Sequence, residues 1–252
     1  MQTTDARPAR HHPYAPPPDV GLQIAYQDDD LLAIDKPSGL LAVPGRIPLL
    51  QDCLATRVCQ RYPQALVVHR LDEATSGLMV FALNAQMQRA LGRAFEERLV
   101  EKTYVAVVNG IVLSESGTVD APLGADWPRR PLQKVDAVNG KPAVTRWKVI
   151  SRDLVQQTTR VQLRPETGRT HQLRVHMQSM GHPICGDMLY GDTLFGDALL
   201  GDALIEGNAP LSTCPSPVTA ETTGRLMLHA LCLRFPHPAH GLAVQIESAL
   251  PF

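Results

Sequence analysis

The sequence lacks the features that would place it in several common classes of protein. It has no run of about 18 apolar residues, the length that a membrane-spanning helix needs. It has neither a G-x-G-x-x-G motif nor a phosphate-binding loop, and residues 1–20 contain no apolar stretch typical of secretory signals. We therefore expect no membrane association, no export signal and no nucleotide cofactor.

Cysteine is scarce, and its spacing does not suggest a framework. The five cysteines are odd in number and contain no C-x-x-C motif, which argues against both a zinc site and a set of disulfides. His171 and His176 lie five positions apart, so they would not share a helix face as a two-histidine metal site requires. We predict a protein of the reducing cytoplasm with no bound metal.

An excess of basic charge is also missing, although the charge is unevenly distributed. The net charge of the chain is −1. Residues 125–180 contain eleven Lys or Arg against four acids, whereas residues 181–224 contain six acids and no Lys or Arg. Such a basic segment can bind phosphate groups even in a protein that is neutral overall. The distribution therefore permits a nucleic-acid partner that the net charge alone would disfavour.

The chain divides into two parts of unequal size. Residues 1–20 contain five prolines and few apolar side chains, so they cannot offset the entropic cost of becoming ordered. We predict a disordered, proline-rich arm there. Residues 21–252 are long enough for one domain with a sizeable core.

Apolar patterning predicts a mixture of strands and helices within this domain. Runs of β-branched and aliphatic residues predict strands at 31–34, 65–68, 78–83, 104–108, 144–150, 159–163, 226–235 and 242–246. Helices are predicted at about 49–62, 85–98 and 170–180. Pro63 would end the first helix, and Gly181 would close the third.

One charged stretch lies between two of the predicted strands. His69–Gly77, with the sequence HRLDEATSG, separates the apolar runs at 65–68 and 78–83. Its Thr-Ser-Gly end has the composition of a turn, so Asp72 would lie on a short loop that is anchored on both sides. A carboxylate held in this way can serve as a nucleophile or a base. For these residues in isolation, an ordinary surface Arg–Asp pair is the more common interpretation.

Three stretches in order resemble the motifs of the RluA family of RNA pseudouridine synthases. They are His69–Gly77, Glu101–Tyr104 (EKTY) and Gly168–Met177 (GRTHQLRVHM), which runs on to Gly181–Asp187. The resemblance extends from about Asp29 to the C-terminus. It implies an α+β pseudouridine synthase fold, with a mixed, mostly antiparallel sheet, flanking helices and a central RNA-binding cleft. It also implies the isomerisation of uridine, a reaction without redox change that needs no cofactor.

The resemblance also assigns roles to residues. Asp72 would be the catalytic carboxylate, Tyr104 the tyrosine that stacks on uracil, and Arg169 the cation that balances the charge of Asp72. Whether Asp72 attacks C1′, attacks the base or removes a ribose proton stays open. The residues expected to bind RNA are His69, Arg70, Arg129, Arg130, Lys134, His171, Gln172 and Arg174.

The implied substrate is structured RNA. Residues 125–131 (ADWPRRP), 133–135 and 140–143 resemble a branch of the family that modifies a hairpin-loop uridine in 23S rRNA and an anticodon-stem-loop uridine in tRNA. No obligatory protein partner is evident, and the short arm has no room for an accessory RNA-binding domain. Two alternatives are another RNA position within the same family and a non-catalytic RNA-binding homologue. A glycoside hydrolase is disfavoured, because Glu73 adjoins Asp72 and cannot form a carboxylate pair across a bond.

One segment departs from the family pattern. Residues 186–205 consist of four Gly-Asp pentads, of which only the first matches the Gly-Asp of the family. Four pentads are too short for an independent solenoid, and their aspartates lack the spacing of a calcium loop. We predict an acidic insertion loop at 186–224 that stays away from RNA phosphates.

Overall fold

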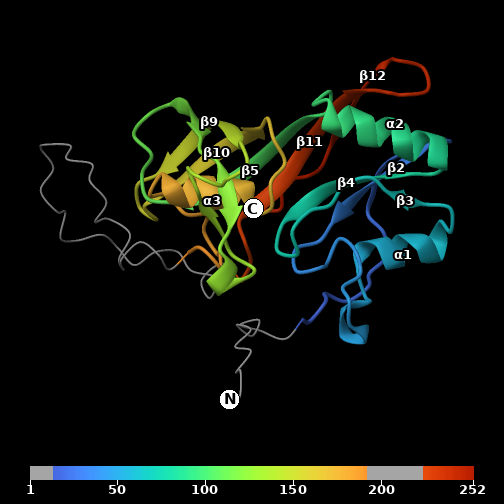
Figure 1. Ribbon diagram of the computed structural model, residues 1–252, viewed down its shortest axis with the longest axis horizontal. Coiled ribbons are helices and arrows are strands. Elements are labelled where there is room, and N and C mark those ends of the chain that lie inside the picture. The colour runs from blue at the N-terminus through green and yellow to red at the C-terminus, as the bar shows by residue number, and fades with distance from the viewer. Residues whose placement is uncertain (1–13, 192–223) are drawn as a thin grey trace, which may run out of the picture.

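A computed structural model of the protein describes residues 14–191 and 224–252. Within them, a ten-stranded sheet passes through the whole molecule (Figure 1). Along this sheet lie β1 (Ile24–Gln27), β2 (Leu31–Lys36), β4 (Ser76–Ala82), β11 (Leu228–Pro236), β5 (Glu101–Asn109), β10 (Thr158–Pro165), β9 (Val144–Asp153) and β6 (Ser116–Asp120). Beside this path, β3 (Leu66–Val67) pairs with β4, and β12 (Ala243–Glu247) pairs with β11.

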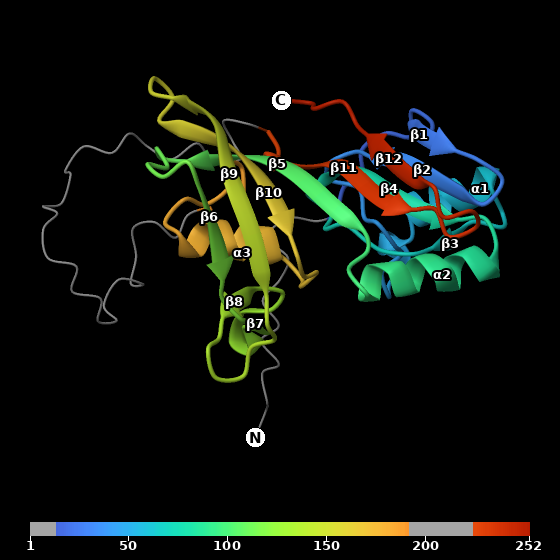
Figure 2. The ribbon, with the colours of Figure 1, turned by 90° about the horizontal axis from the view of Figure 1, so that it is seen from above.

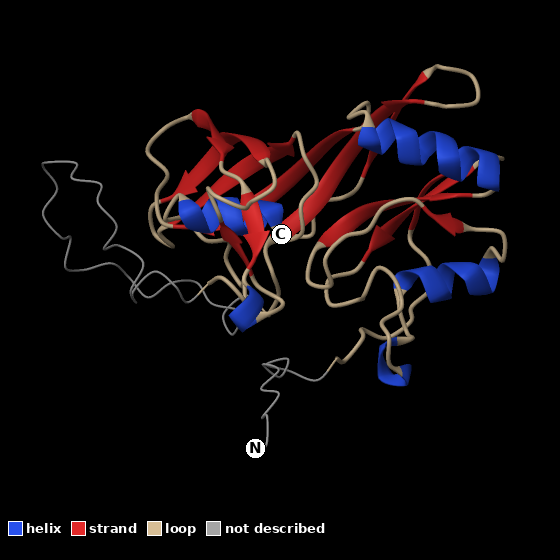
Figure 3. Cartoon of the chain, viewed as in Figure 1, coloured by secondary structure: helices blue, strands red, loops and turns tan. Residues whose placement is uncertain are grey.

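The other elements are few. The helices are α1 (Leu54–Arg61), α2 (Ala85–Glu96) and α3 (Gln172–Ser179), with short 3-10 turns at Pro48–Leu50 and Trp127–Arg129. A separate two-stranded sheet joins β7 (Leu123–Ala125) to β8 (Gln133–Val135). Strands clearly outnumber helices (Figure 3). The pairs between the described strands are antiparallel, apart from β4 with β11, so the expected mixed, mostly antiparallel α+β architecture is confirmed.

The sequence predicted most of these elements. Every strand expected from an apolar run is present, and the helices expected at 85–98 and 170–180 correspond to α2 and α3. The first helix begins later than predicted, at Leu54, because the chain first makes a 3-10 turn at Pro48–Leu50 and Cys53 then caps the helix. The structure adds β1, β6, β7 and β8, which are short and partly exposed and therefore carry little apolar signal.

Two helices cover opposite faces of the sheet at β2 and β4. Alternate residues of a strand point to opposite faces. Leu31 and Ala33 therefore pack in one apolar cluster with α2, while Leu32 and Ile34 pack in another with α1. Burial on both faces explains why residues 31–34 of β2 and 78–82 of β4 are continuous apolar runs rather than alternating ones. Figure 1 shows α1 and α2 at this end of the molecule and α3 at the other.

The helix α3 covers the other half of the sheet. Its residues Leu173 and Met177 pack against Val161 and Leu163 of β10 and against Trp147 of β9. The β7–β8 hairpin lies beside this half and is seen at the far end of β9 in Figure 2. The two halves thus meet along the central strands β4, β11 and β5.

The close contact of β4 with β11 depends on one glycine. These strands pair in parallel at only two positions, His229 with Ser76 and Ala230 with Gly77. Gly77 has φ +109, and a Cβ built on it would lie 2.3 Å from the carbonyl oxygen of Ala230. Only glycine therefore allows β11 to lie against the end of the stretch that carries Asp72.

The structure changes the boundaries of two predicted segments, the disordered arm at 1–20 and the insertion loop at 186–224. Residues 14–20 were assigned to the disordered arm, but Tyr14 is buried and its hydroxyl donates a hydrogen bond to the carbonyl oxygen of Asp52. Residues 1–13 of the arm lie outside the described residues, as does the insertion loop at 192–223. Residues 186–191 are described, and Asp187 and Tyr190 are buried rather than part of a surface loop. No helix of the described chain is long and apolar enough to cross a membrane.

Candidate active site

A cavity of about 590 Å³ lies where the two halves of the sheet meet. Its walls come from the loop before β4, the end of α2, the start of β5 and the loop before α3. A volume of this size is typical of small-molecule sites and can hold a nucleotide. The cavity brings together most of the predicted site residues: His69, Arg70, Asp72, Tyr104, Arg169, His171, Gln172 and Arg174.

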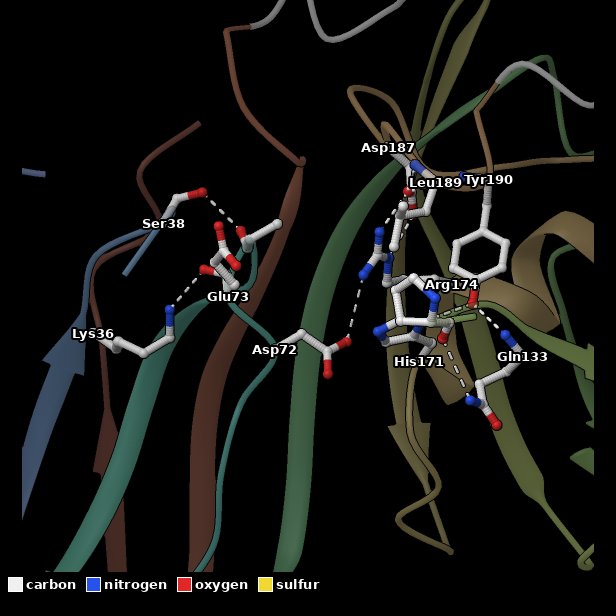
Figure 4. Close-up of polar contacts among 12 residues, drawn as sticks. Lys36, Ser38, Asp72, Glu73, Gln133, His171, Arg174, Asp187, Leu189 and Tyr190 are labelled. Carbon is white, nitrogen blue, oxygen red and sulfur yellow. Dashed lines mark hydrogen bonds and ion pairs between the residues drawn. The ribbon is translucent and has the colours of Figure 1, made fainter. Parts of the chain in front are cut away.

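Asp72 lies on a loop whose backbone is held by hydrogen bonds from Lys36 and Ser38. Lys36, which is fully buried, donates from Nζ to the carbonyl oxygen of Glu73 at 2.9 Å and also to those of Pro37 and Leu40. Ser38 Oγ donates to the carbonyl oxygen of Ala74 at 2.7 Å. Burial lowers the pKa of Lys36 to about 7, against the attraction of Asp72 and Glu73. The turn at 36–39 therefore fixes the loop that presents Asp72 (Figure 4).

The cation beside Asp72 is Arg174. Its Nη1 lies 3.7 Å from Oδ2 of Asp72, while Nε and Nη2 donate to Asp187 at 2.7 and 2.6 Å (Figure 4). Arg174 is 4% exposed, and although burial opposes the charge of its guanidinium, the hydrogen bonds and charge of Asp187 and the charge of Asp72 together raise its pKa. Asp187 thus occupies two nitrogens of the guanidinium fork and leaves the third for Asp72.

This arrangement corrects two predictions about arginines. Arg169 is exposed, and its Nε donates to the carbonyl oxygen of Pro142, so it is not the counter-charge of Asp72. Arg174 was expected to bind RNA, but it is buried between two carboxylates and is not placed to bind a phosphate. The physical reason is position: Arg174 lies in the first turns of α3, which aim it inward, whereas Arg169 lies in the loop before the helix. Arg169 still lines the cavity.

Tyr104 lines the cavity from β5, where it lies opposite Ala230 of β11. Its pKa is raised, first by burial and then by the negative charge of Asp72. The side chain therefore remains a phenol at neutral pH. Because the ring of Tyr104 carries no charge, it can stack on a nucleic-acid base through its apolar face.

His69 and Gln172 line the cavity, but their polar atoms serve the fold. His69 Nε2 accepts a hydrogen bond from the backbone N–H of Val80, and its ring stacks on Phe95 at 4.6 Å between centroids. Burial and the charge of Lys102 lower the pKa of His69 to about 3, so the ring is neutral. Gln172 is buried, with its amide nitrogen bonded to Val144 and its oxygen accepting from Thr167 and from the backbone N–H of Arg169. These bonds leave both residues poorly placed for the RNA contacts that the sequence predicted.

His171 lies between Asp72 and a tyrosine that the sequence analysis missed (Figure 4). Its Nδ1 is 2.7 Å from the hydroxyl of Tyr190, which in turn accepts from the backbone N–H of Gln133 in β8. Tyr190 and Asp187 belong to the first Gly-Asp pentad. The match of that pentad to the family pattern was the available signal for both residues.

The three remaining predicted RNA-binding residues, Arg129, Arg130 and Lys134, lie outside the cavity. They are exposed on the β7–β8 hairpin, where Arg129 pairs with Asp126 at 2.7 Å. The guanidinium of Arg130 stacks over the ring of Trp127, 3.4 Å from its centroid, and this Trp is 69% exposed. The hairpin is thus a basic surface next to the cavity rather than part of its wall.

Comparisons with known proteins place the chain in one family. Residues 30–179 match the RNA pseudouridylate synthase family. The chain is 44% identical to the dual-specificity RNA pseudouridine synthase RluA of Escherichia coli (strain K12), over 95% of this chain and 98% of that protein. It is 51% identical to the protein of the same name from Vibrio vulnificus (strain CMCP6), over 69% of this chain and 71% of that protein.

Solved structures give the same result for the fold. The structure of human RNA pseudouridylate synthase domain containing 1 superimposes with a TM-score of 0.72 at 29% identity, covering 94% of this chain and 87% of that one. Human RNA pseudouridylate synthase domain containing 4 gives a TM-score of 0.68 at 26% identity, covering 90% and 88%. The chain therefore belongs to the RNA pseudouridine synthase family and is an RNA-modifying isomerase of that family.

Proposed function

We propose that this enzyme converts loop uridines of short RNA stem-loops to pseudouridine, at position 746 of 23S rRNA and at position 32 of tRNA. The support is similarity over nearly the whole chain to relatives that are named for dual specificity. The basic hairpin adds a surface for RNA phosphates next to the cavity. No accessory domain is needed to hold a short stem-loop, in which an unpaired base is cheap to extrude.

In the proposed reaction, Asp72 acts at the glycosidic bond. The N1–C1′ bond of uridine breaks, the uracil turns, C5 bonds to C1′, and the proton of C5 is lost while N1 gains one. A carboxylate in the cavity can trap or electrostatically support the electron-poor sugar while the base is detached. The single observation that carries this proposal is the Asp72–Arg174–Asp187 array, which holds an ion pair at the cavity wall.

Arg174 and Tyr104 have supporting roles in this proposal. Arg174 keeps Asp72 charge-balanced in a partly desolvated site, and Asp187 holds the guanidinium in place. Tyr104, a protonated phenol beside Asp72, stacks on the uracil and can exchange a proton with it. Arg70, exposed at the cavity rim, grips phosphate or fills the space of the extruded base.

Asp72→Asn tests the reaction. We expect pseudouridine formation to fall by at least about a thousandfold while RNA binding survives, because the amide keeps the size of the carboxylate but not its charge. The measurement is single-turnover pseudouridine formation, with binding followed separately. Glu73→Gln is the matched control, since it makes the same change at the next residue, which does not line the cavity. Activity of Asp72→Asn close to that of the control would remove Asp72 from the chemistry.

The substrates are tested with an isolated tRNA anticodon stem-loop and the isolated 23S rRNA hairpin. We expect both to be modified in the absence of the ribosome and of intact tRNA. If both stay inert while total cellular RNA is modified, the reaction stands and the substrate assignment is wrong.

A further inference from the structure

The hydroxyl of Tyr190 connects the basic hairpin to the cavity. Tyr190 is 2% exposed and packs among Leu123, Ala143 and Val175, so its ring is held in place. The hydroxyl accepts the backbone N–H of Gln133, at the start of β8, at 2.9 Å. On its other side it lies 2.7 Å from Nδ1 of His171 (Figure 4). One oxygen atom thus joins an element outside the cavity to a residue of its wall.

His171 is held in an unusual backbone conformation. It has φ +55 and ψ +17, the left-handed region that non-glycine residues seldom adopt. Its side chain does not cap α3, although it occupies the N-cap position. Strained residues of this kind tend to occur at functional sites, where the surrounding structure over-determines their position. In this conformation the imidazole contacts the hydroxyl of Tyr190 and lines the cavity.

The imidazole of His171 is neutral at physiological pH. Its pKa is lowered first by burial and also by the charges of Arg174 and Arg70, against the opposing attraction of Asp72 and Asp187. A neutral imidazole has one nitrogen that donates and one that accepts. The hydrogen bond at Nδ1 therefore decides what Nε2 presents.

The Tyr190 hydroxyl favours one of the two tautomers. A backbone N–H can only donate, so the oxygen of Tyr190 is the acceptor towards Gln133. Burial raises the pKa of Tyr190 to about 12, so the phenol keeps its hydrogen. A hydroxyl that accepts one hydrogen bond becomes a better donor for the next. At 2.7 Å, His171 Nδ1 is placed to receive that hydrogen.

We infer that Tyr190 is a positioning residue that holds His171 protonated on Nε2, so that His171 presents an N–H donor to a carbonyl oxygen of the bound uracil. The inference rests on the proposed function for its ligand. Uracil carries two carbonyl acceptors, and negative charge collects on them when N1 leaves C1′. A neutral donor beside Asp72 can stabilise that charge without competing with Arg174 for the carboxylate.

The tautomer can be measured directly, without any substrate. Long-range ¹H–¹⁵N correlation spectra of the full chain, labelled at histidine, separate a protonated Nε2 from a protonated Nδ1. Comparison with His171→Gln identifies the signals of His171 among those of the nine histidines. We expect the parent protein to show a bare Nδ1 and a protonated Nε2. A protonated Nδ1 in the parent overturns the inference, whether or not the substrate assignment holds.

Tyr190→Phe tests the cause. The phenyl ring keeps the packing and loses only the hydroxyl, so we expect the ¹⁵N shifts of His171 to move towards a mixture of tautomers. Tyr14→Phe is the matched control, because Tyr14 also accepts a backbone N–H and donates to a carbonyl, and it does not line the cavity. His171 shifts that are unchanged in Tyr190→Phe rule out this role for the hydroxyl. If Tyr190→Phe does not fold, the parent spectrum alone decides the tautomer.

Kinetics provide the second readout. We expect Tyr190→Phe to lower the single-turnover rate constant on a stem-loop about tenfold with unchanged affinity, the effect of one well-placed hydrogen bond. In His171→Gln the amide nitrogen of the glutamine takes the place of Nε2 and needs no tautomer. Tyr190→Phe should therefore add little in that background. Effects that simply multiply would show that Tyr190 acts independently of His171.

Discussion

At the scale of single residues, one guanidinium organises the charges of the site. Arg174 uses two nitrogens to bind Asp187 and the third to face Asp72. The side chain of Asp187 is fully buried, so it depends on Arg174 for compensation of its charge. The two hydrogen bonds to Asp187 thereby fix the guanidinium of Arg174 in place, so that its third nitrogen stays beside Asp72.

A comparison of Arg174→Lys with Arg169→Lys identifies the arginine that matters to Asp72. An ammonium has no fork and cannot serve both carboxylates, so we expect Arg174→Lys to slow single turnover at least about a hundredfold. Arg169 binds only a backbone carbonyl in the described structure, and its replacement should cost clearly less. The reverse order of the two variants would restore Arg169 as the partner of Asp72. Thermal unfolding should show a lower Tm for Arg174→Lys alone, because Asp187 loses its bidentate partner.

At the scale of elements, the β7–β8 hairpin and the β4–β11 pair have different tasks. The hairpin presents positive charge and an exposed Trp next to the cavity. The parallel contact of β4 with β11 instead joins the two halves of the sheet at Ser76 and Gly77, next to the loop that carries Asp72. Each task can be tested by a substitution that leaves the other element unchanged.

Replacing both Arg129 and Arg130 by Glu should weaken stem-loop binding far more than it slows the bound complex. Each lost phosphate contact also reduces the salt dependence, so the slope of log K against log salt should become shallower by about 0.7 to 0.9 for each contact. The matched control replaces Arg89 and Arg93 by Glu, which reverses two exposed charges on α2. Equal losses of affinity in the two variants would mean that overall charge, not the hairpin, holds the RNA.

Gly77→Ala should destabilise the fold by about 2 kcal/mol or more. The added methyl group would overlap the backbone of Ala230, and the positive φ is unfavourable for alanine. Gly92→Ala is the control, because Gly92 lies inside α2 with nothing within 4 Å of the new methyl group. The control should be neutral or stabilising by up to about 1 kcal/mol, since alanine is the better helix former. Urea unfolding measures both, and a Gly77→Ala variant as stable as the parent would refute the close-contact argument.

At the scale of the whole molecule, positive and negative charges nearly cancel in number but are concentrated in different segments of the chain. A net charge of −1 combines with an exposed basic hairpin, so RNA binding does not require a basic protein.

Burial changes the protonation of His69 when the whole chain folds. His69 is neutral and accepts the N–H of Val80 in the folded protein, whereas in the unfolded chain it is free to take up a proton.

His69 should make stability depend on pH below neutrality. Its pKa is about 3 in the folded protein and about 6.5 when unfolded. Between these values the unfolded chain binds a proton that the folded chain does not, so the free energy of unfolding falls as the pH falls from 6.5. One such group contributes a slope of at most about 1.4 kcal/mol per pH unit.

The measurement is urea unfolding at several pH values between 4 and 7. His69→Gln should show a shallower decline than the parent, by up to that slope. His240→Gln, at an exposed position, is the control. Equal pH dependence in parent and His69→Gln would show that the folded chain takes up a proton at His69 as readily as the unfolded chain, so that folding does not lower the pKa of this residue.

Local patterns in the sequence determined the elements and the loop that carries Asp72. The strands β2 and β4 could be predicted from their apolar runs, because both of their faces are buried. The helix α2 could be predicted from the helical spacing of its apolar residues. The resemblance to the family placed Asp72, Tyr104 and Arg169 in the catalytic set and His171 among the RNA-binding residues, and all four line the cavity. The edge strands β1 and β6 escaped detection, because an exposed edge needs few apolar residues.

Only the tertiary structure decided which side chains face one another. Arg169 and Arg174 lie in one motif, and no periodicity separates a loop arginine from one that the first turns of α3 aim inward. Asp187 and Tyr190 come from a pentad that resembles its three repeats in sequence, yet these two residues are buried against Arg174 and His171. A short motif specifies residue types at fixed spacing, but the direction of each side chain is set by elements that arrive from distant parts of the chain.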